Sequence, residues 1–341
     1  MSIIDSLSAG FNTVTKRIWL IFVPVVLDVY LWLGPRLSVA PVVQRLLPLF
    51  TIPPGMGADY QQMVIQNREL LQQMGQSVNL FSLLSTSMPG VPALMIGATP
   101  QATFLRVAPV VWEGKSLWVY GVALLILWLA GLFVGSLYLT AVGHSVRADD
   151  PDAGDPAGGF LSRVRFVWGR VTLLSVLGGV LVAVLSLPLS FALGLLALLN
   201  VNLALIGLTL LMGTALWMGF YLVFVIPAIV IDRTGMWRAI WNSLNVVARN
   251  FWATLGLVLL SLFINFGFSV IWQRMSTGSW LTFMAIVGNA YLGTGLVAAM
   301  FVFYRSRYAL WQQERGRQGD KERGRQGGKE KFPQDTRYKD G

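Results

Sequence analysis

The stretch from Val171 to Ile231 contains no Asp, Glu, Lys, Arg or His. A run of this length cannot be covered by a water-facing surface, because about a quarter of the residues in soluble domains are charged. The whole chain shows the same bias, since its 341 residues are 55% hydrophobic and only 12% charged. Lipid must therefore be the solvent for much of the molecule, which predicts an integral membrane protein.

The apolar stretches predict an all-α fold, a polytopic membrane helix bundle of about six spans. A helix needs roughly 20 apolar residues to cross a bilayer core of about 30 Å. Residues 188–202 are apolar but interrupted by Pro188, Gly194 and Asn200, which leaves a helix continuation, an interfacial hairpin or a seventh span open. The expected spans are Ile18–Leu33, Leu117–Val142, Trp168–Leu187, Leu203–Ile231, Phe251–Trp272 and Leu281–Tyr304.

The cations are distributed unevenly between the two sides of these six spans. With the N-terminus inside, the inner segments hold 20 of the 26 Lys and Arg residues, in groups of two, four, three and eleven. Short cytoplasmic loops of membrane proteins are enriched in these residues. We therefore expect a multi-pass protein of the cell inner (plasma) membrane with both termini in the cytoplasm, and we interpret the first span as an uncleaved signal anchor.

Four regions follow from these boundaries. Residues 1–37 are an interfacial helix and the first span, residues 38–116 an extracytoplasmic segment with an amphipathic helix at 60–85, and residues 117–304 membrane helices 2–6. Residues 305–341 form a basic tail whose low apolar content predicts disorder. Its cations favour binding to anionic lipid headgroups. Acidic residues interleaved with these cations weaken the binding of both lipid headgroups and RNA, and we expect the lipid surface and not nucleic acid as the partner.

Three expected spans begin with the same spacing of an apolar residue, a cation and a tryptophan. The cation precedes the tryptophan by three positions, which puts both on one helix face at the headgroup level. Two interpretations stay open. Either the bundle consists of three repeated hairpins, each with a cytoplasmic interfacial helix, or the match is chance. The interfacial anchors are Lys16 and Trp19, Arg165 and Trp168, and Arg249 and Trp252.

The stretch 224–252 also carries the pattern of a known family. A proline in the span is followed by an acidic residue and a glycine, and then by an Ala-x-x-x-Ser helix that ends before an aromatic pair. This pattern resembles the bacterial membrane-domain family associated with glycerophosphodiester phosphodiesterases. The family's soluble catalytic domain has no counterpart here, so the resemblance implies a six-helix architecture without the activity. The matching residues are Pro227, Asp232, Gly235, Ala239, Ser243, Phe251 and Trp252.

Asp28 is the only ionisable residue well inside an expected span. An acidic residue at a helix centre costs about 2.5–3.5 kcal/mol on insertion scales, so such residues are functional candidates. Asn265 and Asn289 are polar residues on other spans that Asp28 could meet. One interpretation is proton or cation coupling by this group. The other is a residue that pins helices together or lies nearer the outer interface.

No catalytic, cofactor or metal motif can be recognised. The chain has no cysteine and a single histidine, His144, which excludes disulfides and multi-histidine metal sites. It has no Gly-x-Ser-x-Gly motif. The acidic residues at 149, 150, 152 and 155 lack the distal Glu of a calcium loop. We interpret them as a solvated loop, and His144 as an interface residue.

The expected function is that of a non-enzymatic membrane protein that organises or supports other membrane or envelope components. Its expected partners are the lipid bilayer, anionic lipid headgroups and other membrane proteins. The alternative is a transporter or channel that uses Asp28, Asn265 and Asn289 along its path.

Overall fold

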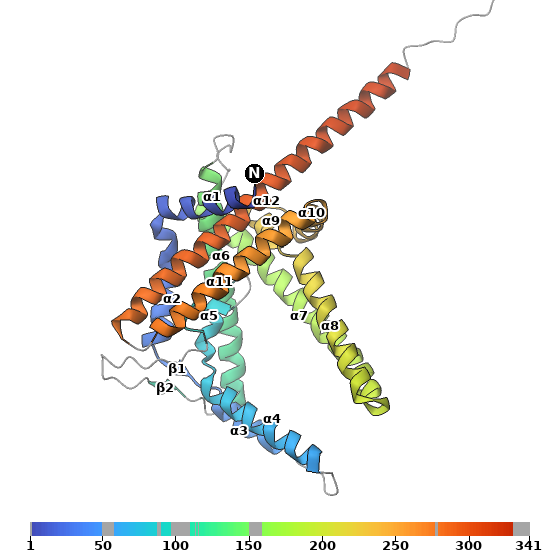
Figure 1. Cartoon of the computed structure of the whole chain (residues 1–341). Coiled ribbons are helices and arrows are strands. Elements are labelled where there is room, and N and C mark those ends of the chain that lie inside the picture. Colours follow the sequence, from blue (N-terminus) through green and yellow to red (C-terminus); the bar gives the residue numbers. More distant parts are fainter. Residues whose placement is uncertain are drawn as a thin grey trace, which may run out of the picture.

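The computed structural model describes residues 2–49, 58–86, 90–96, 110–112, 114, 116–149, 159–276 and 279–329. In this part of the chain the fold is all-α, as predicted (Figure 1). The exception is a short parallel pairing of β1 (Arg36–Leu37) with β2 (Val111–Trp112). The membrane helices are α2 (Phe22–Leu33), α6 (Leu117–Ala148), α7 (Phe160–Leu199), α8 (Val201–Tyr221), α9 (Val225–Asp232), α11 (Phe251–Met275) and α12 (Trp280–Lys329).

The remaining helices lie at the two ends of the membrane helices. Two of them, α1 (Ile3–Lys16) and α10 (Met236–Arg249), each precede a membrane helix and so occupy the positions expected for interfacial helices. The other three described helices, α3 (Ala40–Leu46), α4 (Ala58–Ser77) and α5 (Leu83–Thr86), belong to the segment 38–116. There are also 3-10 turns at Ile18–Ile21, Leu47–Leu49 and Leu80–Ser82.

Among the described residues, five helical stretches are long and apolar enough to cross a membrane. The sixth expected span is the shorter apolar stretch Ile18–Leu33, where the 3-10 turn Ile18–Ile21 precedes α2. At 1.5 Å per residue the 12 residues of α2 extend only about 18 Å. The multi-pass architecture is thus confirmed, while the first of the six stretches is shorter than a full crossing.

Residues 188–199 continue α7, so the helix-continuation interpretation of this stretch is correct. Pro188 lies inside the helix, which ends at Leu199. Membrane helices tolerate an internal proline although it removes one backbone hydrogen bond. Asn200 then adopts an extended conformation, and its side chain accepts a hydrogen bond from the backbone N–H of Asn202 at the start of α8. The turn at Asn200 makes α7 and α8 a hairpin.

Two of the three expected interfacial helices are separate elements. The helices α1 and α10 end at the predicted cations Lys16 and Arg249, and the residues that follow, Arg17 and Asn250, have φ angles of −133° and −124°. The prediction of a separate interfacial helix before the third span was wrong, because α7 runs without a break from Phe160. Its buried residues Val164, Val167 and Val171 form one continuous stripe, and the last two pack on Leu132 of α6. A break in α7 at this point would move the valines away from α6, so the helix stays continuous.

The centre of the bundle is built from α1, α6, α9 and α12. The helix α1 crosses α12 closely, so that a Cβ atom on Gly10 would overlap the backbone of Ala299. Val14, Tyr138 and Tyr304 are among the residues that are completely or almost completely buried in the core cluster. Close approach at small residues is how membrane helices gain packing energy without a hydrophobic driving force.

The hairpin of α7 and α8 stands apart from this centre. Figure 1 shows the two helices diverging together from the bundle. The 40-residue helix α7 buries only the three valines named above, and α8 buries no residue. At 1.5 Å per residue α7 is about 60 Å long, twice the thickness of the bilayer core. A helix of that length must tilt or extend beyond the hydrocarbon.

Two predicted segments end differently in the structure. The amphipathic helix expected at 60–85 ends as α4 at Ser77, because Asn79 accepts hydrogen bonds from the backbone of Leu37 and Phe81 and redirects the chain. The tail expected to be disordered continues α12 to Lys329. A helix that extends from an anchored span needs no new nucleation, and Glu, Arg, Gln and Lys favour its propagation. Residues 330–341 lie outside the described part.

Candidate functional site

Asp28 is completely buried and fixes a distant backbone segment. The backbone N–H of Leu94 donates to its Oδ2 atom at 2.8 Å, and that of Met95 donates to Oδ1 at 2.9 Å. In the described part of the chain these two amides are the hydrogen-bond partners of the carboxylate. Asp28 therefore ties the segment 90–96 to α2.

The two candidate asparagines are not joined to Asp28 by hydrogen bonds. Asn265 lies on α11 with its side chain exposed, and Asn289 lies half-buried on α12. Any shared path for ions would have to include the exposed outer face of α11 at Asn265.

The predicted anchors take three different environments at one end of the bundle. Trp19 and Trp252 are 56% and 79% exposed, as expected for indoles at a headgroup level. Trp168 instead packs edge-on against Phe133 of α6 at a centroid distance of 5.8 Å. Arg249 lies 3.4 Å from Glu314 and also above the ring of Trp311. The remaining anchors are Lys16, at the end of α1, and Arg165, which is exposed.

The residues of the family-like pattern bind helix ends together. The hydroxyl of Ser243 donates to the carbonyl of Tyr221 at 2.7 Å and accepts from the backbone N–H of Phe224 at 3.1 Å, which bridges α8 and α9. The hydroxyl of Tyr304 donates to Asp232 at 2.5 Å. Ala239 is completely buried, as a small residue must be at a helix contact. The pattern therefore has a structural explanation in this chain.

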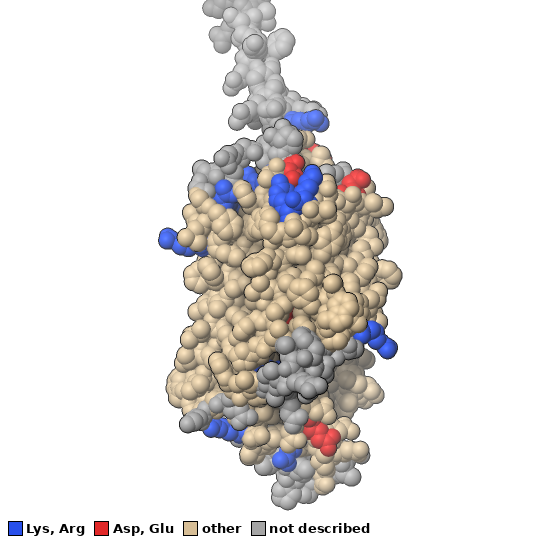
Figure 2. Space-filling view, turned by 90° about the vertical axis from the view of Figure 1, so that its left-hand side faces the viewer, with Lys and Arg blue, Asp and Glu red and all other residues tan. Residues whose placement is uncertain are grey.

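We name the end of the bundle that carries these contacts the basic end. It comprises the C-terminal ends of α1, α6 and α9, the helix α10, the N-terminal end of α7 and residues 305–315 of α12. On the face shown in Figure 2, charged side chains gather at this end, from which α12 projects, above a broad band that is almost without charge. Arginines cross-link the helix ends here. Arg147 donates to the carbonyl of Ile231 at 2.7 Å, and Arg305 donates to that of Val146 at 3.2 Å.

Asp149 joins α1 to the end of α6 at the basic end. Thr13 donates to its Oδ2 atom at 2.7 Å and Arg17 to its Oδ1 atom at 2.8 Å. Partial burial raises the pKa of this carboxyl, but the bonds from Thr13 and Arg17 and the charges of Arg17 and Lys16 outweigh it and hold the pKa below its usual 3.8. Asp149 is thus a structural contact, which corrects its assignment to a solvated loop. Residues 150–155 lie outside the described part.

His144 is exposed at this end, and its Nδ1 atom lies 2.8 Å from Nη1 of Arg163. This contact joins α6 to α7. The interpretation of His144 as an interface residue stays a prediction.

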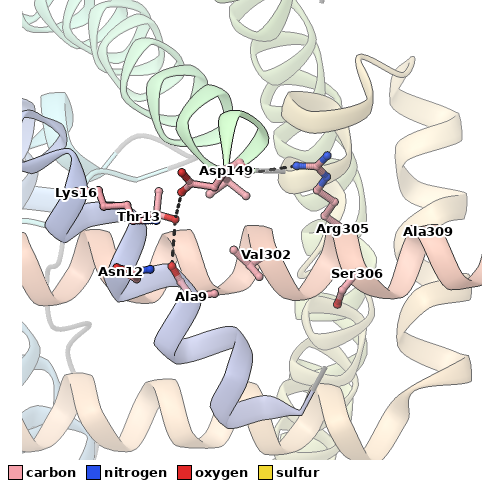
Figure 3. A pocket seen from close by; sticks show the side chains of 10 residues that line it. Ala9, Asn12, Thr13, Lys16, Asp149, Val302, Arg305, Ser306 and Ala309 are labelled. Carbon is pink, nitrogen blue, oxygen red and sulfur yellow. Dashed lines mark hydrogen bonds between the residues drawn. The ribbon is translucent and has the colours of Figure 1, made fainter. Parts of the chain in front are cut away.

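Two hollows flank α12 at the basic end. The first has a volume of about 460 Å³ and lies between α1, α6 and α12, where Lys16, Asp149 and Arg305 point into it (Figure 3). The second, of about 450 Å³, lies between α6, α9, α10 and α12 and is lined by Arg147, Arg238 and Arg305, with Asp232 as its acidic residue. Arg305 is shared by both.

The sequence did not predict the second hollow, because Arg305 was assigned to the tail expected to be disordered and not to the last membrane helix. Four of its lining residues, Arg305, Tyr308, Ala309 and Gln312, lie at helical spacing on α12. That spacing puts them on one face, which would have indicated a polar helix surface directly after the last span.

A third candidate surface is apolar and belongs to the hairpin. A groove of about 430 Å³ between α8 and α11 is lined by Met212, Gly219 and Phe220, among others. Apart from the adjoining backbone of their own helix, no described heavy atom lies within 4 Å of a Cβ atom built on the hairpin glycines Gly169, Gly178, Gly179, Gly194, Gly213 and Gly219. The hairpin therefore presents small residues to its surroundings instead of to the bundle.

Comparison with known proteins adds no relative to this description. No protein-family model, no curated protein and no solved structure matches the chain.

Proposed function

We propose that this protein is a non-enzymatic membrane scaffold whose α7–α8 hairpin docks a transmembrane helix of another membrane protein. The observation that carries the proposal is the open space at the hairpin glycines. Lipid can cover any apolar surface, so exposed leucines and valines alone would not point to a protein partner. Glycines are different, because small residues in membrane helices mark the positions where helix backbones approach closely.

Several glycines of the bundle follow that rule, while Gly121 of α6 and Gly267 of α11 face open space. Gly10 meets the backbone of Ala299, Gly143 meets Val230, and Gly295 meets Phe11. On the hairpin, Gly207 is filled by Leu193 and Leu196 across the turn, whereas Gly178, Gly179 and Gly213 face open space. The proposed occupant is one apolar helix with small residues of its own, since only such a helix can approach these positions closely.

The shape of the hairpin supports the same occupant. A helix as long as α7 must tilt in a bilayer or extend beyond the hydrocarbon, and α7 and α8 diverge together from the bundle (Figure 1). The groove between α8 and α11 lies on this hairpin and includes Gly219. A helix that enters there would contact α8 on one side and Val258 of α11 on the other.

The proposed location is a bacterial inner membrane with both termini in the cytoplasm. The excess of cations in the inner segments and the family-like pattern at 224–252 support this location. In this orientation the basic end faces the cytoplasm, and the basic residues of α12 and the tail lie near anionic headgroups.

The experiment is site-specific photo-crosslinking of the full-length chain in its native membranes. A photoreactive residue at position 213 should form an adduct with a different protein, and mass spectrometry should map the crosslink to an apolar transmembrane helix. Gly178→Leu and Gly179→Leu should abolish the adduct without lowering the unfolding temperature, because no described atom outside the adjoining helix backbone lies within 4 Å of a Cβ atom at either position. A photoreactive residue at exposed Phe266 of α11 is the matched control.

Three results would contradict the proposal. Adducts with lipid alone would show that the hairpin is simply solvated by the bilayer. Adducts between two copies of this chain would replace the foreign helix by self-assembly. An adduct that survives both leucine substitutions would show that the contact does not depend on the open glycines.

A further inference from the structure

The second hollow at the basic end holds more positive than negative charge. Arg147, Arg238 and Arg305 line it, against the single carboxylate of Asp232. That carboxylate already accepts the hydroxyl of Tyr304. The three guanidinium groups come from α6, α10 and α12, so the fold itself brings them together from distant parts of the chain.

Among the described residues, part of the donor capacity of Arg147 and Arg238 remains unused. Nη1 of Arg147 donates to Ile231, but its Nε is buried without a hydrogen-bond partner among the described residues. Arg238 has no hydrogen-bond or ion-pair partner in the described part of the chain, and its side chain is exposed. A buried donor without an acceptor costs free energy, so an acceptor within the hollow would stabilise this arrangement.

Neutral donors complete the lining. Thr234, Tyr308 and Gln312 contribute a hydroxyl, a phenol and an amide. Guanidinium groups match the oxygen atoms of phosphate in a forked geometry, and such charge-assisted bonds are the stronger ones in proteins. The first hollow differs, because its cations Lys16 and Arg305 face Asp149, which is already paired with Arg17.

We infer that the second hollow binds a phosphate-bearing anion. Its place at the end of the membrane helices suits the headgroup of an anionic phospholipid, and Trp237 and Trp241 of the adjacent α10 are 76% and 62% exposed, as interfacial indoles are. The same groups would also hold a soluble phosphate ester. This site does not depend on the proposed docking of a helix by the hairpin.

The test uses the purified full-length chain in phosphatidylcholine nanodiscs. One arm adds phosphatidic acid to the disc, and the other adds glycerol 3-phosphate to the buffer. The unfolding temperature is measured in both arms as a function of ligand concentration, and native mass spectrometry counts retained phosphatidic acid. A saturable rise confined to the first arm assigns the site to a lipid headgroup, and one confined to the second arm assigns it to a soluble ester.

Arg238→Gln should weaken binding at least about tenfold in the arm that responds, because the loss of one charged hydrogen bond is worth about 1.5–3 kcal/mol. It removes no contact within the described chain, so the fold should be unaffected. Gln312→Glu is a second variant that places a carboxylate in the hollow, and it should weaken binding similarly. Arg165→Gln is the matched control, since Arg165 is an exposed cation of the basic end outside both hollows.

The inference is overturned if neither phosphate compound raises the unfolding temperature. It is also overturned if Arg238→Gln and Gln312→Glu bind as the unchanged chain does. Equal weakening by Arg165→Gln and Arg238→Gln would show attraction by the general surface charge, and would likewise exclude a built site.

Discussion

The bundle and the hairpin use the same kinds of residue for opposite purposes. In the bundle, glycines let α1 lie against α12 and let side chains of neighbouring helices reach the backbone. On α7 and α8, Gly178, Gly179 and Gly213 meet nothing within 4 Å beyond the backbone of their own helix, whereas Gly207 is filled by Leu193 and Leu196 of the same hairpin. Since lipid is as apolar as leucine, helices in a membrane associate where they fit and not merely where they are hydrophobic. The difference therefore separates a part that is packed within the chain from a part whose glycines the rest of the chain leaves open.

The largest expected effect comes from filling a glycine in each region. Gly10→Leu should destabilise the protein by about 3 kcal/mol or more, because the new side chain would overlap the backbone of Ala299, which cannot rotate away. Gly178→Leu should not destabilise the protein, because its side chain would meet open space and leucine favours a helix more than glycine does. Unfolding temperatures of both variants in the same detergent give the comparison directly.

Equal destabilisation by the two substitutions would break the distinction between the regions. It would mean that α7 is packed against other elements in solution as tightly as α1 is. Gly10→Ala serves as the conservative control and should fall between the unchanged chain and Gly10→Leu.

The second prediction concerns how the bundle holds its outer segment. Asp28→Asn should cost about 2–3 kcal/mol, because an asparagine has one carbonyl oxygen for the two backbone N–H groups of Leu94 and Met95 and turns a donor toward one of them. Proteolysis within 90–96 should accelerate as this segment detaches. Asn265→Leu is the matched control and should change neither, because its side chain is exposed on α11.

An unchanged rate of proteolysis in Asp28→Asn would show that other contacts hold the segment. The same variant also bears on the transporter alternative. Reconstituted vesicles that lose an ion flux while the segment 90–96 stays protected would favour that alternative over a structural role.

The features of the fold differ in how far sequence alone could predict them. Helix length, charge-free stretches and the tryptophan at position 252 are local properties, so the spans and the helix before α11 could be predicted. The partner of Asp28 lies 66 and 67 residues away along the chain, in an irregular segment whose path no periodicity encodes. The break at Arg17 and its absence in α7 likewise depend on what each helix packs against, which here is α6 for the valine stripe of α7.

The candidate sites were harder to predict than the fold for the same reason. Arg147, Arg238 and Arg305 were visible as cations that set the topology, but they belong to three helices that only the tertiary structure brings around one hollow. The open glycines could not be recognised either, because a glycine in an apolar run looks the same whether a neighbour fills its space or not.

A smaller effect is expected at the junction between α9 and α12. Tyr304→Phe removes the hydroxyl that donates to Asp232 and should cost about 1–2 kcal/mol, since the ring stays in the fully buried core. Tyr308→Phe is the control and should cost less, because the Tyr308 hydroxyl only accepts a 3.3 Å bond from Asn242. Unfolding in detergent measures both. A larger loss in Tyr308→Phe would place the stronger junction on α10 instead of α9.

The smallest expected effect lies at the rim of the bundle and depends on pH. Asp149 has a lowered pKa in the folded chain, so its contribution to stability is complete above the unfolded value of 3.8 and is lost as the pH falls through the lower folded value. The side chains of Asp149 and Arg17 are 26% and 27% exposed, and solvent screening limits the contribution to about 0.5–1 kcal/mol. The difference in unfolding temperature between the unchanged chain and Asp149→Asn should therefore be constant from neutral pH down to about 4 and shrink only below it. A difference that shrinks already near neutral pH would mean that a titrating group other than Asp149 controls the contact between α1 and the end of α6.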